Sequence, residues 1–316
     1  MDTQQLKKDF GKLLKDNHQS HRRLFDPDET NCFRVYNWNI ASIPWYIDFY
    51  DYYLHIVSFA DTHNPDLLDF EPELLKTVSS MLYVPAERVY FKHRLIQGKE
   101  SQQEKLDESK NIRIVRENSL RFKVNLSDYM DTGLFIDHRL SRQMVREFSA
   151  GQRVLNLFGY TGSFSVYAAS GGAVSTTTVD LSSSYLRWAR DNMELNGFAG
   201  GMHRFEAVDA RVFLTAASQG NEKYDIIILD PPTFSNSRKM DGTFDIQRDY
   251  VWFIGNALTL LSKKGVLFFS TNFHKFHFDK GRIRGAEIEE MSRITIPPDF
   301  TGKKKPHRSW VIRPKG

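Results

Sequence analysis

The sequence contains a single cysteine, Cys32, among 316 residues. A lone cysteine cannot close an internal disulfide, and it cannot supply a cysteine-rich zinc site or an iron–sulfur cluster. Long apolar runs are also missing, as is the apolar segment of a signal peptide near the start. The sequence therefore predicts no membrane span and no secretion signal, and it favours a cytoplasmic location.

Neither sign of charge strongly predominates, because 43 Lys and Arg residues oppose 39 Asp and Glu residues for a net charge of +4. Such a small excess is compatible with a polyanionic partner but does not require one. The composition, 41% hydrophobic and 26% charged, excludes disordered and low-complexity classes. The length exceeds one average domain, so we expect two modules.

The first part of the chain has the pattern of a small α+β domain, which we predict over residues 1–128. Its polar first 30 residues predict a helix, residues 33–60 predict a strand pair, and residues 72–82 predict a second helix. Shorter strands are expected at Val89–His93, Ile112–Arg116 and Leu120–Asn125. Residues 129–150 predict a connecting hairpin and then a helix whose apolar face carries Leu140, Met144 and Phe148.

Residues 151–316 alternate between apolar strands and amphipathic helices, which is typical of a doubly wound α/β sheet. The expected strands are Arg153–Phe158, Ser175–Asp180, His203–Val208, Asp225–Asp230, Val266–Thr271, Ser292–Ile296 and Ser309–Ile312. The expected helices between them are Ser163–Ser170, Ser183–Asn196, Ala210–Ser218 and Asp245–Leu261. We therefore predict a Rossmann-like sheet of seven strands.

A glycine turn follows the first of these strands, in the run VLNLFGYTGS. Gly159 and Gly162 allow the backbone to approach a ligand at the carboxyl end of the strand. A nicotinamide dinucleotide site requires a third glycine, so the spacing disfavours an oxidoreductase. The alternative is an ordinary tight turn.

Carboxylates follow the next two strands. Asp180 is placed where an acid can accept hydrogen bonds from both hydroxyls of a ribose. Asp209 is placed where an acid can meet the exocyclic amine of an adenine. Each of them could instead cap the helix that follows, and the sequence leaves this open.

The run ILDPPTF is the sharpest motif of the chain. Pro231 and Pro232 directly follow an apolar strand, so they hold a rigid, extended segment at the carboxyl edge of the sheet. This segment can form one wall of a base pocket, with Asp230 facing the cleft. Phe234 can stack on a base that has been turned out of its helix.

Together these motifs resemble the class I S-adenosylmethionine-dependent methyltransferases. The runs YMDTGLFIDHR, LNLFGYTGSFSV, STTTVDLS, LDPPTFSNSRKM and FDIQRDY, with CFRVYNWNIASIPWYIDFYD earlier, resemble the bacterial 23S rRNA guanine-N7 methyltransferase family RlmK. That family is usually the C-terminal half of fused RlmKL proteins, so we expect a stand-alone form or an excised half. The resemblance implies methylation of a guanine in helix 74, on 23S rRNA or a large-subunit assembly intermediate, with the first domain holding RNA.

The resemblance also implies the site residues. The segment with Phe135, Asp137 and Arg139 would cover S-adenosylmethionine, Arg139 meeting its carboxylate and Asp137 its ammonium or the acceptor; a surface ion pair is the alternative. The other cofactor-binding residues would be Asn156, Phe158, Gly159, Tyr160, Thr161, Gly162, Asp180, Leu181, Ser182, Asp209, Ala210 and Asp230. The catalytic residues would be Asp230, Pro231, Pro232 and Phe234, and the RNA contacts Asn236, Arg238, Lys239, Asn272 and Lys275.

The chemistry of the acceptor separates related families. Methylation at carbon 5 of cytosine, as in RlmI-type enzymes, normally uses a cysteine nucleophile, and Cys32 lies far from the cofactor motifs. Guanine N7 has an exposed lone pair, needs no deprotonation and gains positive charge that carboxylates stabilise. Enzymes for exocyclic amines carry an aromatic residue directly after the prolines, whereas Thr233 intervenes here. We therefore favour direct in-line transfer to N7.

Several alternatives stay open. The acceptor could be guanine N2 or cytosine C5, or the chain could be a non-catalytic RNA-binding protein of ribosome assembly. His274 and His277 with Asp279 resemble a metal pattern, but loop histidines are usually solvated, so we predict no metal.

Overall fold

The computed structural model describes residues 3–60, 65–94, 111–236, 242–300, 302 and 305–315. The chain forms two compact units. The first unit comprises Met1–Ile136 together with Pro298–Lys304, and the second comprises Asp137–Pro297 together with Lys305–Gly316. The polypeptide therefore passes between the units after residues 136, 297 and 304.

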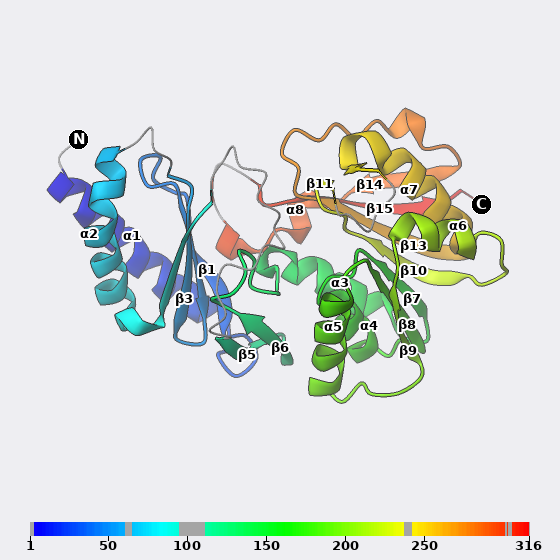
Figure 1. Ribbon diagram of the computed structural model, residues 1–316, viewed down its shortest axis with the longest axis horizontal. Coiled ribbons are helices and arrows are strands. Elements are labelled where there is room, and N and C mark those ends of the chain that lie inside the picture. Colours follow the sequence, from blue (N-terminus) through cyan, green and yellow to red (C-terminus); the bar gives the residue numbers. More distant parts are fainter. Residues whose placement is uncertain are drawn as a thin grey trace. The chain divides into compact units, whose positions relative to one another are not determined.

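The first unit is built on a sheet that is covered on one face by two helices (Figure 1). Its strands, in spatial order, are β1 (Cys32–Asn37), β2 (Trp45–Tyr50), β3 (Tyr53–Ser58) and β4 (Val89–His93). The helices are α1 (Thr3–Leu24) and α2 (Pro65–Leu82), and a separate hairpin is formed by β5 (Ile112–Glu117) and β6 (Leu120–Asn125). Phe10 and Leu74 from the helices pack with Trp45 in the core. Because α2 connects β3 to β4, these two strands are parallel, whereas the other neighbours are antiparallel.

A late segment of the chain completes this unit. The short helix η4 (Pro298–Phe300) lies against β1, where the Asp299 carboxylate accepts a hydrogen bond from the Arg34 backbone N–H at 3.0 Å. The Arg34 guanidinium lies 4.2 Å from the ring centre of Tyr46 and 4.5 Å from that of Phe300. It also pairs with Asp48 at 2.7 Å, so the segment is fastened by charge and by aromatic contact.

The second unit contains the seven-stranded sheet, with the spatial order β14-β15-β13-β10-β7-β8-β9. The strands are β7 (Arg153–Leu157), β8 (Ser175–Asp180), β9 (His203–Ala207), β10 (Tyr224–Leu229), β13 (Leu261–Thr271), β14 (Ala286–Glu290) and β15 (Arg308–Pro314). The helices are α3 (Arg139–Phe148), α4 (Ser163–Ser170), α5 (Ser183–Leu195), α6 (Ala210–Ala217), α7 (Ile246–Leu260) and α8 (Ser292–Thr295). The strands from β13 to β9 are parallel, and β15 runs antiparallel to both β13 and β14.

Strand β10 shows why this sheet is buried on both faces. Alternate side chains of a strand point to opposite faces. Ile227 and Leu229 join the core that contains residues of α6 and α7, whereas Ile226 and Ile228 pack with residues of α3 and α4. The continuous apolar run is therefore explained by helices on both sides, as Figure 1 shows. The predicted fold class, a doubly wound α/β sheet with a smaller α+β part, is confirmed.

The order of the strands also locates the crevice where a ligand can bind. The chain runs from β7 through β8 to β9 in one direction, and then β10 lies on the other side of β7. Open α/β sheets bind ligands at such a switch point, outside the carboxyl ends of the strands. Among the described residues, no helix is long and apolar enough to cross a membrane.

Two strand predictions were wrong. Residues 33–60 form three strands, because Asp51 and Tyr52 make a tight turn with φ values of 48° and 63° although neither is glycine. The predicted strand Ser292–Ile296 is instead the short helix α8, and the missing strand is β14. Three glutamates in the five residues of β14 hid it from a search for apolar runs, but such charge suits an edge strand.

The segment before β7 also differs from its prediction. In place of a hairpin, residues 129–135 form a loop that leads into the 3₁₀ helix η2 (Ile136–His138) and then α3. The buried side chains of α3 include Arg139, Arg142 and Val145, whereas Phe148 is 47% exposed. The predicted apolar face was wrong because α3 presents charged side chains to the interior.

Candidate active site

The glycine turn after β7 has a strained backbone. Phe158 and Tyr160 have positive φ values of 56° and 50°, and Gly162 follows with 75°. A Cβ atom on Gly159 would lie 2.4 Å from Cγ2 of Thr178, which is closer than atoms can approach. Gly159 therefore lets the turn after β7 pack closely against β8, where a side chain would collide.

Asp180, at the end of β8, fastens this turn. Its carboxylate accepts hydrogen bonds from the backbone N–H groups of Tyr160 at 2.9 Å and Ser182 at 2.8 Å. Burial raises the pKa of Asp180, and these two hydrogen bonds act against that rise. The side chain that caps α5 belongs to Ser182, which accepts from the Tyr185 N–H. The alternative that Asp180 caps α5 is therefore wrong. The Asp180 carboxylate has further acceptor positions for hydroxyl groups.

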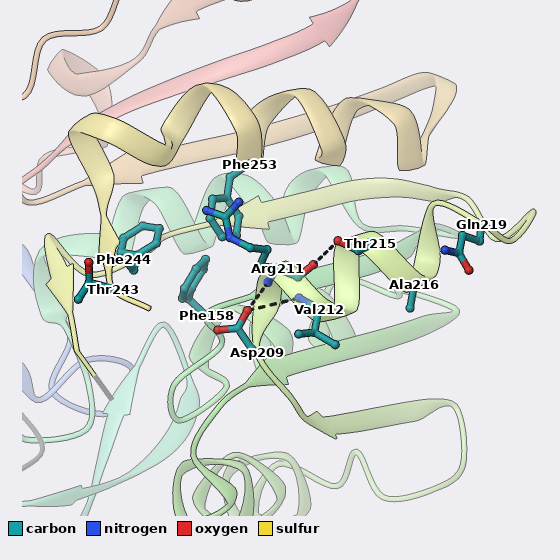
Figure 2. Close-up of a pocket in the computed structure, with 10 residues that line it drawn as sticks. All are labelled: Phe158, Asp209, Arg211, Val212, Thr215, Ala216, Gln219, Thr243, Phe244 and Phe253. Carbon is teal, nitrogen blue, oxygen red and sulfur yellow. Dashed lines mark hydrogen bonds between the residues drawn. The ribbon is translucent and has the colours of Figure 1, made fainter. Parts of the chain in front are cut away.

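Asp209 lies at a cavity of about 570 Å³ beside the start of α6 (Figure 2). It does cap this helix, because its carboxylate accepts from the N–H groups of Arg211 at 2.7 Å and Val212 at 3.3 Å. Three aromatic rings, of Phe158, Phe244 and Phe253, line the same cavity. Its size falls within the range of small-molecule sites, and flat apolar walls with one acid suit a purine ring.

Arg211 also lines this cavity, but its charge is directed to α7. Its guanidinium lies 4.2 Å from the ring centre of Trp252 and 3.4 Å from the Asp249 carboxylate. Burial would raise the pKa of Asp249, but hydrogen bonds from Arg248 and from the Asp245 N–H, with both arginine charges, lower it overall. Asp249 thus stays ionised and pairs with Arg211, and Asp209 is the acid among the residues that line the cavity.

A second group of polar residues surrounds Asp230, which follows β10. Ser270 on β13 donates a hydrogen bond to Oδ1 of Asp230 at 2.6 Å. The other oxygen, Oδ2, lies 3.7 Å from Nε2 of His138, and the same nitrogen lies 3.7 Å from Oδ2 of Asp137. The two carboxylates that the sequence predicted for the site are thus brought to the same nitrogen of one imidazole.

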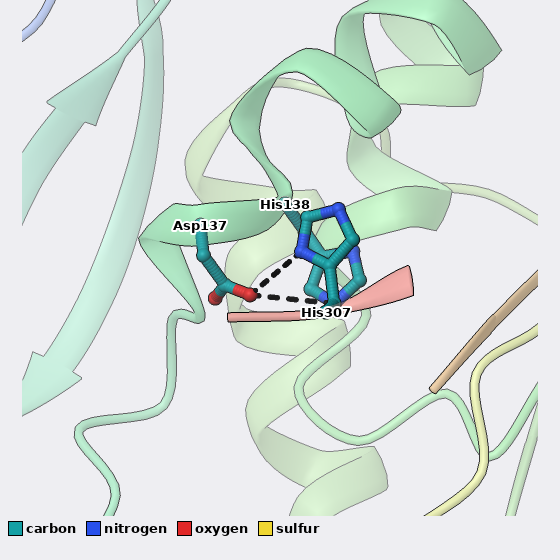
Figure 3. A group of neighbouring side chains, drawn as sticks. All are labelled: Asp137, His138 and His307. Carbon is teal, nitrogen blue, oxygen red and sulfur yellow. Dashed lines mark hydrogen bonds and ion pairs between the residues drawn. The ribbon is translucent and has the colours of Figure 1, made fainter. Parts of the chain in front are cut away.

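His307 completes the group (Figure 3). The sequence predicted no role in the site for either His307 or His138. The ring of His307 stacks on that of His138, with 4.2 Å between ring centres and 14° between planes. Nδ1 of His307 donates to Oδ2 of Asp137 at 2.9 Å, since a carboxylate only accepts. In the sequence, His138 lies between Asp137 and Arg139, which were both predicted as site residues, so its position could have indicated a role in the site. His307 lies in a basic loop whose sequence gives no such indication.

Asp137, His138 and His307 offer donor types that metals bind, and their donor atoms lie within 4.8 Å of one another. A metal site requires the lone pairs of its ligands to converge on one point. The two stacked rings hold their lone pairs in nearly parallel planes, and His307 already donates to Asp137. We therefore interpret the group as a hydrogen-bonded cluster.

Several predicted residues have other partners. Asn156 is only 2% exposed, and its amide donates to Ser165 Oγ at 3.0 Å within a buried polar network. Arg139 is 2% exposed, which excludes the surface ion pair considered for it. The backbone carbonyl of Thr161 accepts from Asn192 at 2.9 Å. Phe135 belongs to the first unit.

The remaining predicted residues surround the DPP segment or flank the strand ends. Phe234 is 55% exposed, and Asn236 and Lys275 are exposed as well. Asn272 accepts a hydrogen bond from the Thr233 hydroxyl at 2.7 Å, which joins the DPP segment to the loop after β13. Pro231 and Ala210 are buried, and Pro232 and Leu181 are half-buried. Arg238 and Lys239 lie outside the described residues.

The fold and this edge of the sheet define a class of enzyme. A seven-stranded sheet with antiparallel β15, a glycine turn and acids after successive strands is typical of the class I methyltransferases. A family model for S-adenosylmethionine-dependent methyltransferases matches residues 70–302. The chain therefore belongs to the S-adenosylmethionine-dependent methyltransferase family.

Individual relatives and structures agree with this family. The chain is 38% identical over 309 residues, 97% of its length, to the ribosomal RNA large subunit methyltransferase K/L of Desulfotalea psychrophila. It is 39% identical over 307 residues, 96% of its length, to the protein of the same name from Pseudomonas putida. The chain spans 42% of the length of each relative.

A solved structure shares the fold. SMU.776, described as a methyltransferase and crystallised with SAH, superposes with a TM-score of 0.78 at 23% identity. The match covers 97% of this chain and 81% of that one. At this identity the likeness shows a common fold.

Proposed function

We propose that the chain transfers the methyl group of S-adenosylmethionine directly to N7 of a guanine in the helix 74 region of 23S rRNA. The names of the relatives at 38% and 39% identity support ribosomal RNA as the substrate. The substrate is then 23S rRNA itself or a large-subunit assembly intermediate, and the first unit helps to hold it.

The described residues fit the methyl donor. The cavity of about 570 Å³ suits the adenine, with Asp209 facing its amine, and Asp180 accepts from the ribose hydroxyls. The glycine turn from Gly159 to Gly162, at the carboxyl end of β7, would receive the amino acid part together with Asp137 and Arg139. When bound, S-adenosylmethionine supplies a methyl group on a positively charged sulfur.

One observation carries the choice of acceptor: Asp137 and Asp230 both lie beside Nε2 of His138 at the carboxyl edge, and no thiol is among the described residues there. Cys32, the single cysteine, is fully buried in β1 of the first unit, and its Sγ contacts the Arg116 carbonyl at 3.3 Å. Carbon-5 chemistry would lack its nucleophile. Guanine N7 needs no base, and two carboxylates stabilise the positive charge that the methylated ring acquires.

The residues around the DPP segment would hold the base and the RNA strand. Pro231 and Pro232 keep Asp230 at the edge of the crevice, and the exposed ring of Phe234 can stack on the guanine. The RNA contacts would come from Asn236, Asn272 and Lys275, together with Arg238 and Lys239.

The test is to incubate the purified protein with S-adenosylmethionine and 23S rRNA from a strain that lacks the enzyme. We expect one N7-methylguanosine per rRNA by nucleoside mass spectrometry, located by mass mapping in helix 74. A methylated cytosine, or no methylation of either free rRNA or assembly intermediates, contradicts the proposal.

A second candidate acceptor is guanine N2, because His138 is a titratable group beside Asp230. Methylation of an amine requires the loss of a proton, which a neutral imidazole can accept. The same experiment separates the two, because this candidate predicts N2-methylguanosine.

A further inference from the structure

The two carboxylates beside the DPP segment are held by a pair of histidines. Nε2 of His138 lies 3.7 Å from Oδ2 of Asp137 and 3.7 Å from Oδ2 of Asp230. The second ring, of His307, stacks on the first and hydrogen-bonds Asp137. We call these four side chains the histidine–carboxylate cluster.

The cluster is fixed from several strands and helices. The Thr295 hydroxyl on α8 hydrogen-bonds Nε2 of His307 at 3.2 Å and also contacts Ser309 Oγ at 2.7 Å. Ser270 on β13 holds Asp230. Both imidazoles are buried, and Nδ1 of His138 has no hydrogen-bond partner among the described residues. A proton on that nitrogen would remain unsatisfied, so the packing favours a neutral His138.

The charges around His138 lead to the same conclusion. The ionisable groups that face it are Asp137 on η2, Asp230 after β10, His307 before β15 and Arg142 on α3. Burial, with His307 and Arg142, lowers the pKa of His138 more than the two carboxylates raise it. Near neutral pH the lowered pKa of His138 therefore favours a neutral ring beside the two carboxylates.

We infer that the stack of His138 and His307 is a positioning device that aims Asp137 and Asp230 at the positive charge of the methyl donor. His138 lies 3.7 Å from both acids and His307 holds Asp137, so the stack keeps both carboxylates directed at the sulfonium. A proton on either ring would place a positive charge within the cluster and weaken binding of the cationic donor. This inference rests on the proposed contact of these two acids with the donor, and it needs no particular RNA acceptor.

The test compares two ligands that differ in this charge. S-adenosylmethionine has a sulfonium, whereas S-adenosylhomocysteine has a neutral thioether and is otherwise similar. We expect calorimetry at pH 7.5 and 5.5 to show that the affinity for the sulfonium ligand, relative to the thioether, falls by about tenfold at the lower pH. In His138→Gln, which keeps a donor but cannot be protonated, the ratio should change clearly less with pH than in the wild type, because one of the two titratable rings is gone.

The matched control is His277→Gln, the same substitution at an exposed histidine of the second unit. It should retain the pH dependence of the wild type. If His138→Gln does not fold, His307→Gln carries the same test, because it removes the second titratable ring. A ligand ratio that is independent of pH in the wild type, or unaltered by both variants, overturns the inference.

A role for His138 as a general base would give a different result. The rate of methyl transfer at pH 7.5 would then fall by about 100-fold or more in His138→Gln while the ligand ratio kept its pH dependence. That outcome also overturns the inference. Because the binding experiment contains no RNA, a failure of the proposed rRNA acceptor leaves its result intact.

Discussion

Each unit contains buried or half-buried acids, and the two sets are used differently. In the first unit, Glu71 is 5% exposed, and its carboxylate accepts from Ser58 at 2.7 Å and from Trp45 at 3.2 Å. Its second oxygen pairs with His93 at 2.7 Å. In the second unit, the side chains of Asp137 and Asp230 are 15% and 25% exposed and lie at the open edge of the sheet.

The difference lies in how far each acid is exposed and in what its partners join. Glu71 has partners for both oxygens inside the first unit, so its charge serves to join α2, β2, β3 and β4. Asp137 accepts a hydrogen bond from His307 and Asp230 accepts one from Ser270, and Nε2 of His138 lies 3.7 Å from both carboxylates. An acid that is held in place but remains partly exposed can interact with a ligand, whereas a buried acid with partners for both oxygens stabilises the fold.

The largest effect should come from Asp230→Asn. We expect the methyl-transfer rate to fall by about 100- to 1,000-fold, because the carboxylate no longer stabilises positive charge in the transition state. The denaturation midpoint and the affinity for RNA should stay near their wild-type values. Asp225→Asn, at the opposite end of β10, is the control and should leave the rate nearly unchanged. If Asp230→Asn and Asp225→Asn lost methyl-transfer activity equally, the proposed role of Asp230 in the site would be contradicted.

Glu71→Ala tests the structural role of the buried acid in the first unit. It leaves Trp45, Ser58 and His93 without their acceptor, so the free energy of unfolding should fall by about 3 kcal/mol. Urea denaturation measures this, and donor affinity per folded molecule should be retained. Glu73→Ala on the same helix loses only exposed ion pairs and should have little effect. A loss of donor binding in folded Glu71→Ala would show that this buried acid is not purely structural.

A smaller effect is expected from pH. Burial lowers the pKa of His18 to about 4, that of His55 well below its usual range, and that of His138 to a lesser degree. The unfolded chain therefore takes up protons first as the pH falls below about 6.5. The free energy of unfolding should decrease below that pH, by up to about 1.4 kcal/mol per pH unit for each histidine. Urea midpoints at pH 7.5, 6.5 and 5.5 test this, and an increase toward pH 5.5 would contradict it.

The smallest effect should come from Cys32→Ala. The residue is buried in β1, so stability should fall by about 1 kcal/mol from the lost packing. Methyl transfer to rRNA should stay within about twofold of the wild type, because no covalent intermediate forms. Abolished transfer in a folded variant would restore the cytosine alternative.

Much of the second unit could be predicted because its strands are buried on both faces. Ile226–Leu229 is apolar without alternation, and the acid after it must then lie at the carboxyl edge. Asp209 shows the limit of this reasoning, since a helix cap and a ligand contact need the same residue type at the same place.

The histidine–carboxylate cluster could not be predicted for a different reason. Asp137 and His307 are 170 positions apart in the sequence, and only the pairing of β15 with β13 brings the end of the chain to this edge. His307 follows the lysines at positions 303–305, and nothing in that basic sequence indicates a contact with Asp137. No local pattern marks a side chain whose partner is set by the topology of the sheet.

The placement of Pro298–Phe300 in the first unit has a consequence for synthesis of the protein on the ribosome. The Arg34 backbone N–H and guanidinium gain their contacts with Asp299 and Phe300 only after residue 300 has been translated. Strand β15 emerges after that segment, so the seven-stranded sheet is complete only when residues 308–314 have been added. Translation that stops at Pro297 therefore leaves both units unfinished.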